Sequence, residues 1–298
     1  MKLIISFIFH LSSFIFHLSS FIFIFVFVSC EHEVEVDYPT ADAKVVFDAQ
    51  VSNENVFVRI SHTRPMADST KNHFISDAQV WVADDEGTEE QLYYDAQQQA
   101  FLSPTGMVGT SGHTYQMRAV VEGHQYEAKA TMPPPAVVDT IFFRWIDVLH
   151  QSRIFFVCVR GKEPLPGERN FFLCRLMRGQ ELFRWNPRSG RSNQEGVFEY
   201  DIICSTESEM ETGFDDNGKT PLMDGDTLRM ELMTIDYECW RYFQSLMASN
   251  STTANPVTNI RGGGIGVFMA TNITRPDTLV FDKETLLTLP SASRLASP

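Results

Sequence analysis

The residues best suited to hold a metal ion lie between positions 214 and 226. Two clusters of acidic residues lie there, and a Gly-Lys turn separates them. Carboxylate and amide oxygens are the ligands that calcium prefers. The spacing departs from the EF-hand loop, which needs Gly at its sixth position and Glu at its twelfth. We therefore interpret the segment as solvated turns, with calcium as the alternative. The residues are Asp215, Asp216, Asn217, Asp224 and Asp226.

The remaining motifs predict neither a nucleophile nor a cofactor. No His-Glu-x-x-His metal motif occurs. The Gly-rich run at 262–266 lacks a Walker Lys-Ser/Thr, and residues 265–269 have a strand pattern rather than the helix start that phosphate binding uses. Residues 109–112 do not match the Gly-x-Ser-x-Gly elbow of hydrolases. We predict no catalytic residue and no cofactor.

A basic and aromatic stretch between positions 175 and 191 is the leading candidate for a contact with a partner. It stands out in an otherwise acidic chain, and Arg and Trp are enriched at interface hot spots. The alternative is an ordinary solvated β-ribbon, which the weak compositional signal of interfaces favours. The candidate residues are Arg175, Arg178, Arg184, Trp185, Arg188 and Arg191.

Four of the five cysteines follow Cys30, an even number that permits disulfides in an exported protein. Segments 153–160 and 171–178 have the pattern of two strands of one hairpin. Cys158 and Cys174 lie symmetrically about position 166, so they could face each other and form a disulfide. Against this, free cysteines are often buried as small apolar residues, and direct cross-strand pairing has restrictive geometry.

The first thirty residues indicate export. Lys2 precedes an apolar run over residues 3–28, which ends at Ser29 and Cys30. We predict a signal peptide at 1–29, cleavage before Cys30, and lipidation of Cys30 as a stable membrane anchor. The alternative is an uncleaved transmembrane helix, since about 20 apolar residues span a bilayer. The acidic segment that follows lacks the Lys and Arg of a stop-transfer flank and argues against that alternative.

Charge excludes one class of partner. The 298 residues contain 24 Lys and Arg against 38 Asp and Glu, a formal net charge of −14. A surface of this sign repels phosphate backbones, so we predict that the protein does not bind nucleic acid.

The elements that must position these residues are mainly β-strands. Short runs such as 56–60 and 80–82 alternate apolar and polar residues and are separated by Gly and Pro turns. We predict a lipidated tether at 30–39 and an immunoglobulin-like or transthyretin-like β-sandwich at 40–132. Three consecutive prolines mark a linker at 133–137, because proline donates no backbone hydrogen bond. A second β-rich domain follows at 138–298.

One helix is predicted at about 236–249. Asp236 can cap its first turn, and Cys239, Trp240 and Phe243 recur at spacings of three and four residues. We expect this apolar face to pack on one side or end of the C-terminal sheet.

An ordered set of short segments resembles a Bacteroidetes outer-membrane lipoprotein family that is known as a domain of unknown function. The resemblance implies two-domain lipoproteins of the cell surface, often encoded beside TonB-dependent receptors, without catalytic residues to carry over. The duplicated signal segment and Cys239 depart from the family pattern. The segments are 44–46, 77–80, 112–115, 138–141, 224–228, 255–260 and 262–268.

We therefore expect a non-enzymatic, lipid-anchored binding or accessory protein at the outer membrane, facing the cell exterior. It would assist a TonB-dependent receptor in nutrient uptake. One alternative is a surface-exposed hydrolase, which needs acidic or nucleophilic side chains that converge in one cleft. Another is a structural adhesin or assembly subunit, which would present an open strand edge or a large apolar patch.

Overall fold

Strands make up most of the chain in the computed structural model, which describes residues 42–64, 73–148, 153–191, 196–214, 220–249 and 255–291. These segments belong to one compact unit, residues 42–298. The mainly β prediction is confirmed. The predicted signal peptide, Cys30 and the tether lie outside the described residues, as do Asp215, Asp216 and Asn217.

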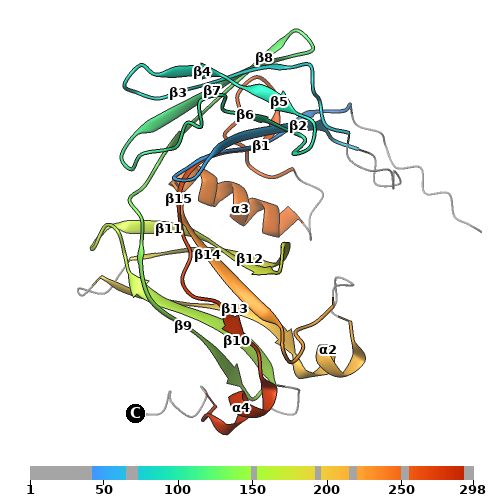
Figure 1. The fold of residues 1–298 in the computed structure, drawn as a ribbon, viewed down its shortest axis with the longest axis vertical. Coiled ribbons are helices and arrows are strands. Elements are labelled where there is room, and N and C mark those ends of the chain that lie inside the picture. The colour runs from blue at the N-terminus through green and yellow to red at the C-terminus, as the bar shows by residue number, and fades with distance from the viewer. Residues whose placement is uncertain are drawn as a thin grey trace, which may run out of the picture. The chain divides into compact units, whose positions relative to one another are not determined.

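The largest sheet joins strands from both ends of the described chain (Figure 1). Among the described residues it has nine strands, ordered β12-β11-β14-β15-β1-β2-β6-β5, with β16 beside β14. Its centre is the parallel pair of β1 and β15, in which Phe47 lies opposite Gly266. The strands are β1 (Val45–Ser52), β2 (Val56–His62), β5 (Tyr93–Asp95), β6 (Ala100–Leu102), β11 (Arg169–Arg178), β12 (Glu181–Arg191), β14 (Thr227–Thr234), β15 (Ile265–Thr274) and β16 (Leu279–Val280).

Two smaller sheets pack against the large sheet and create two apolar cores. Near β1 and β2 the partner has the order β4-β3-β7-β8, and near β11 it has the order β13-β10-β9. Side chains alternate along the strands, so β11 contributes Leu173 to the first core and Phe172, Cys174 and Leu176, on its other face, to the second. These strands are β3 (Gln79–Ala83), β4 (Glu89–Gln91), β7 (Thr114–Val121), β8 (His124–Thr131), β9 (Val137–Ile146), β10 (Ile154–Lys162) and β13 (Val197–Thr206).

Helix α3 (Tyr237–Ser249) confirms the predicted helix. Asp236 caps it, because one carboxylate oxygen accepts the Cys239 N–H at 2.9 Å, while the other accepts the Thr131 N–H at 3.1 Å. The helix contacts β11, β12 and β15 of the large sheet. Short helices α2 (Glu207–Thr212) and α4 (Lys283–Thr288) complete the helices of the described chain. No helix in these ranges is long and apolar enough to cross a membrane.

The predicted linker falls where residues 132–136 form no strand, and β9 begins at Val137. The two flanking parts nevertheless share one sheet, because β15 pairs with β1. Residues of β15 and α3 also contribute to the core that β1, β2, β3, β7 and β8 form. The predicted sandwich of residues 40–132 therefore includes elements from the C-terminal part, and its division from a second domain stays a prediction.

The predicted hairpin of segments 153–160 and 171–178 is wrong. β10 pairs with β9 and β13, whereas β11 pairs with β12 and β14 in another sheet. The connection between β10 and β11 leads from one sheet to the other. A buried hydrogen bond stabilises it, because Asn170 Nδ2 donates to Glu163 Oε2 at 2.8 Å. Cys158 and Cys174 are buried free thiols, so the disulfide prediction is also wrong.

Gly266 allows the close approach of β15 to β1, and its replacement tests that approach. Its φ is +106°, and a Cβ atom there would lie 1.9 Å from the Phe47 carbonyl oxygen. Gly263 is a matched control, because its φ is +89° but its Cβ would meet no atom within 4 Å. We expect Gly263→Ala to lower the free energy of unfolding by about 1 kcal/mol and Gly266→Ala by at least about 3 kcal/mol. Denaturant unfolding measures both, and equal losses would contradict the close approach.

Candidate functional site

The structure separates the predicted partner-contact residues onto the two faces of the β11–β12 pair. Arg178 Nη1 and Nη2 each donate at 3.0 Å to the carbonyls of Pro221 and Thr220. Arg184 Nε donates to the Cys204 carbonyl at 3.1 Å, and Arg188 donates to the Asp201 carbonyl.

These three arginines connect β11 and β12 to neighbouring segments through hydrogen bonds to backbone carbonyls. Arg191 ends β12, and its side chain lies outside the described part. Only Arg175 and Trp185, which are directly opposite each other in the ladder, line a cleft together.

The two described residues of the predicted calcium cluster, Asp224 and Asp226, make internal contacts. Asp226 Oδ2 accepts the Met223 N–H at 2.9 Å and an Arg178 N–H at 3.2 Å. Asp224 Oδ1 accepts the Lys283 N–H at 2.7 Å. Within the described ranges, no three His, Cys, Asp or Glu side chains are arranged to hold a metal ion.

The cleft has a volume of about 660 Å³. It lies against α3 on the face of the large sheet that carries Asp48, Arg175 and Glu231. Trp185 and Phe243 of α3 form one wall, with their ring centres 5.8 Å apart and an angle of 63° between the ring planes. Phe57 of β2 lines the cleft as well, with the Arg59 guanidinium 4.8 Å from its ring centre. Aromatic surface and a few charged groups thus share one cavity.

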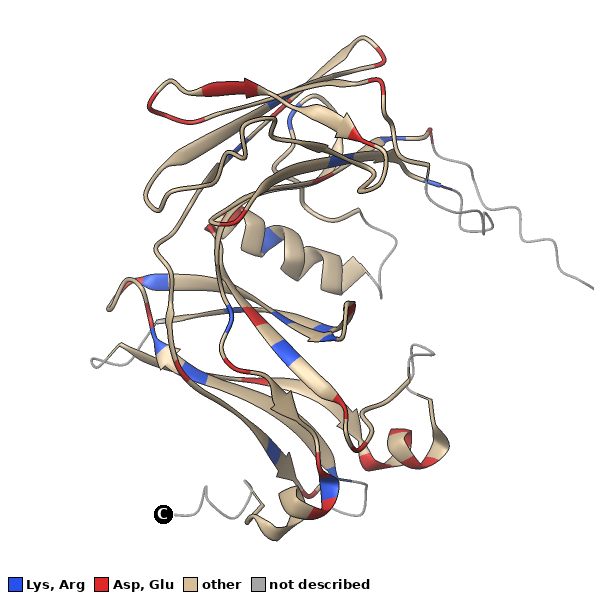
Figure 2. Cartoon of the chain, viewed as in Figure 1, with Lys and Arg blue, Asp and Glu red and all other residues tan. Residues whose placement is uncertain are grey.

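Glu231 is the charged centre of the cleft floor, and its side chain is only 7% exposed. Arg275 Nε donates to Glu231 Oε1 at 3.0 Å, and Arg275 Nη2 forms an ion pair with the same oxygen at 3.0 Å. Arg175 and Arg229 lie farther away, with nitrogen-to-oxygen distances of 3.6 and 3.8 Å. Burial lowers the pKa of Arg275 from its usual value. Figure 2 shows basic and acidic positions next to each other along β14.

Each carboxylate of the cleft is paired with a guanidinium. Asp48 lies 3.4 Å from Arg59, and Glu54 pairs with Arg275, which also binds Glu231. A carboxylate held in this way orients its arginine and is not a free general base in the cleft. The arrangement is therefore suited to binding an amphipathic molecule.

Glu231 and Arg275 were not predicted from the sequence. A signal was present for Glu231, since it interrupts the apolar run of Met230, Leu232 and Met233, and a charge inside a strand core needs a partner. Arg275 follows β15, and nothing in its neighbours indicates that it reaches Glu231.

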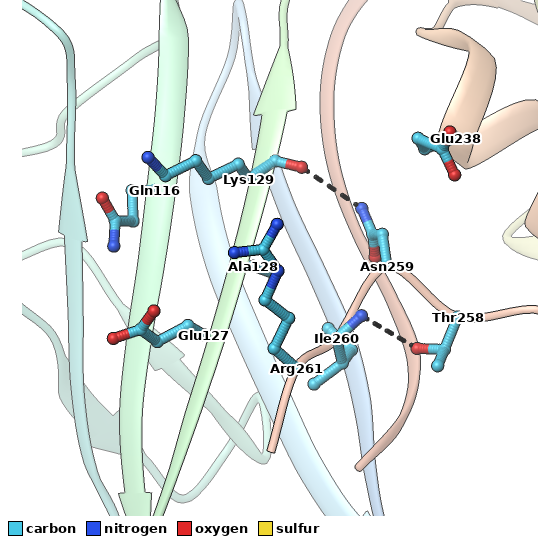
Figure 3. A pocket seen from close by; sticks show the side chains of 9 residues that line it. All are labelled: Gln116, Glu127, Ala128, Lys129, Glu238, Thr258, Asn259, Ile260 and Arg261. Carbon is cyan, nitrogen blue, oxygen red and sulfur yellow. Dashed lines mark hydrogen bonds between the residues drawn. The ribbon is translucent and has the colours of Figure 1, made fainter. Parts of the chain in front are cut away.

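A second, smaller hollow of about 370 Å³ lies over β7 and β8 (Figure 3). Its lining includes Lys129, Glu127 and Arg261, and the loop that carries Arg261 is fixed by Asn259. The Asn259 side chain accepts the Phe268 N–H at 3.0 Å and donates to the Phe268 carbonyl at 2.8 Å. Glu127 and Arg261 exchange two backbone hydrogen bonds. This hollow is polar and lacks the aromatic wall of the cleft.

The four cysteines in the described part of the chain do not form a reactive site. Burial raises the pKa of Cys174 and Cys204 to about 12 each, and it also raises the pKa values of Cys158 and Cys239. Thiolates are the reactive form of cysteine, so these four thiols serve as packing residues.

The fold and the cleft define a mainly β protein with an amphipathic cleft, and its family follows from comparison with known proteins. The chain matches the domain of unknown function DUF4249 over residues 31–276, and it belongs to this family. The search of curated proteins found no match.

Two solved structures show limited similarity. A cytokine receptor complex is 8% identical, with 84% of this chain and 99% of that chain covered and a TM-score of 0.25. The chicken interferon gamma receptor alpha chain is 10% identical, with 65% and 90% covered and a TM-score of 0.18. At these TM-scores the similarity supports no argument about this protein.

His113 forms a charged contact outside the cleft. Its Nδ1 lies 2.8 Å from Asp85 Oδ1, and Asp85 Oδ2 accepts the Thr114 N–H at 3.0 Å. The hydrogen bond to Asp85 raises the pKa of His113 above 6.5, while the bonds from Thr114 and His113 lower the pKa of Asp85 below 3.8.

The sign of both shifts predicts a pH window for this contact. The contribution of His113 to stability is complete below pH 6.5 and is lost as the pH rises through the raised pKa of His113. The contribution of Asp85 is lost as the pH falls below 3.8 and through the lowered pKa of Asp85. An NMR titration should give His113 a pKa above 6.5, and Asp85→Asn should lower it, whereas Asp95→Asn should not. An unchanged His113 pKa in Asp85→Asn would refute the contact.

Proposed function

We propose that this protein is a non-enzymatic, lipid-anchored binding protein at the outer surface of the outer membrane, where it assists a TonB-dependent receptor in nutrient uptake. The observation that carries the proposal is the cleft between α3 and the large sheet. Its aromatic wall and paired charges suit the capture of a small molecule.

The cleft has the properties of known ligand sites. Its volume of about 660 Å³ falls within the range of about 300–1,000 Å³ that is typical of small-molecule pockets. Such pockets combine apolar walls with a few polar groups that orient the ligand. The arginine partners of Asp48, Glu54 and Glu231 favour binding over the hydrolase alternative, which needs an unpaired acid or base.

The proposed location rests on the N-terminal sequence. Lys2, the apolar run and Cys30 have the pattern of a lipoprotein signal, and the family match begins at residue 31, directly after Cys30. The receptor partner and the exterior orientation come from the resemblance to surface lipoproteins that are often encoded beside such receptors.

Gentle detergent extraction of native outer membranes tests the proposal. We expect the wild-type protein to co-purify with a TonB-dependent receptor, identified by mass spectrometry. Cys30→Ser is the control, because it removes the acylated sulfur and should move the protein to the soluble fraction without the receptor. Cys239→Ser leaves that sulfur in place and should keep the wild-type distribution. A wild-type protein that emerges alone, under conditions that preserve other receptor complexes, would refute the accessory role.

A further inference from the structure

Arg175 is the cleft cation with the fewest internal contacts. It lies on β11, the second strand of the large sheet, between Trp185 of β12 and Glu231 of β14 in the ladder. Its Nη1 is 3.6 Å from Glu231 Oε2, beyond hydrogen-bond distance, and its side chain is 31% exposed. Its side chain makes no hydrogen bond to another residue in the described ranges. A guanidinium has five N–H donors, so those of Arg175 are available to a molecule in the cleft.

The carboxylates of the cleft make their closest contacts with arginines other than Arg175. Asp48 pairs with Arg59 near the rim. Arg275 pairs with Glu54. The two shortest contacts of Glu231 are also with Arg275. Three arginines, Arg175, Arg229 and Arg275, therefore share the two carboxylates Glu54 and Glu231. Arg229 is not among the lining residues, and the lining holds three arginines (Arg59, Arg175 and Arg275) against three carboxylates (Asp48, Glu54 and Glu231), a balanced set in a chain with a formal net charge of −14.

The surroundings of Arg175 define the rest of the ligand. Its ladder partner Trp185 packs on Phe243, and Leu182 and Met177 line the same part of the cleft. A guanidinium beside an aromatic wall fits a molecule that has an anionic group next to an apolar body. Arginine binds carboxylates in a planar, bidentate arrangement that lysine does not reproduce.

We propose that the cleft binds a small organic carboxylate, whose anionic group is held by Arg175 and whose aromatic or aliphatic body lies against Trp185 and Phe243. This assignment rests on the proposed binding function and adds the chemical class of the ligand. Arg275 fixes Glu231 in place, and Glu231 in turn orients Arg175 toward the cavity. The carboxylate would replace water at the Arg175 donors without breaking an internal hydrogen bond.

Calorimetric titration with three probes of the same shape tests the assignment. The probes are 3-phenylpropanoate, 3-phenylpropan-1-ol and 3-phenylpropylammonium, added to the purified lipoprotein in lipid nanodiscs, with empty nanodiscs as the blank. We expect the carboxylate to bind at least about tenfold more tightly than the alcohol, and the ammonium to bind most weakly. Arg175→Gln should lower the affinity for the carboxylate about tenfold and leave the affinity for the alcohol unchanged.

Two further variants separate charge from packing. Trp185→Ala should weaken the carboxylate and the alcohol equally, because both lose the aromatic wall. Arg118→Gln removes an arginine from β7, where it pairs with Glu89 outside the cleft, and should bind all three probes as the wild type does. Near-ultraviolet circular dichroism and thermal midpoints verify that each variant is folded.

Two results would overturn the assignment. One is a wild-type protein that binds the three probes equally or binds none of them. The other is a folded Arg175→Gln variant that keeps the preference for the carboxylate. Neither result affects receptor co-purification, so failure of the ligand class is distinguishable from failure of the proposed function.

Discussion

The parallel pairing of β1 with β15 is the constraint on which the rest of the structure depends. It joins the first and last long strands of the described chain, in register from Val46 opposite Ile265 to Ser52 opposite Thr271. Gly266 permits the backbone approach that this register needs. Through β15, the β1–β2 pair becomes continuous with β14, β11 and β12. The pairing thus places the two apolar cores on a single sheet.

The cleft is a consequence of that continuity. The smaller sheets bury parts of the large sheet, and α3 contacts β11, β12 and β15 of that sheet. Cleft residues come from both sides of the β1–β15 pair, with Phe57 on one side and Trp185 on the other. Arg275 connects the same two sides, because it binds Glu54 in the β1–β2 turn and Glu231 on β14. The charge network therefore depends on the same long-range contact as the fold.

Local patterns were predictable from the sequence, and long-range partners were not. The alternation of apolar and polar residues predicted the strand at 56–60. The capping residue and the spacing of apolar residues predicted α3, because both signals come from residues close together in the sequence. The 153–160 and 171–178 segments are strands, but alternation does not specify a partner, so the predicted hairpin and the Cys158–Cys174 disulfide were wrong. The basic stretch contained Arg175 and Trp185. A bulge between Leu176 and Met177, which the sequence does not reveal, helps to determine which residues of β12 face the cleft.

Hydrogen exchange measured by NMR tests the central claim most directly. If β1 and β15 form one parallel ladder, the amide protons of Phe47, Ala49 and Val51 should exchange at the same slow rate as those of Val267 and Met269, through global unfolding. The Gly266→Ala substitution should accelerate both sets together. Exchange of β15 that is independent of β1, with fast rates in one strand and slow rates in the other, would contradict the account.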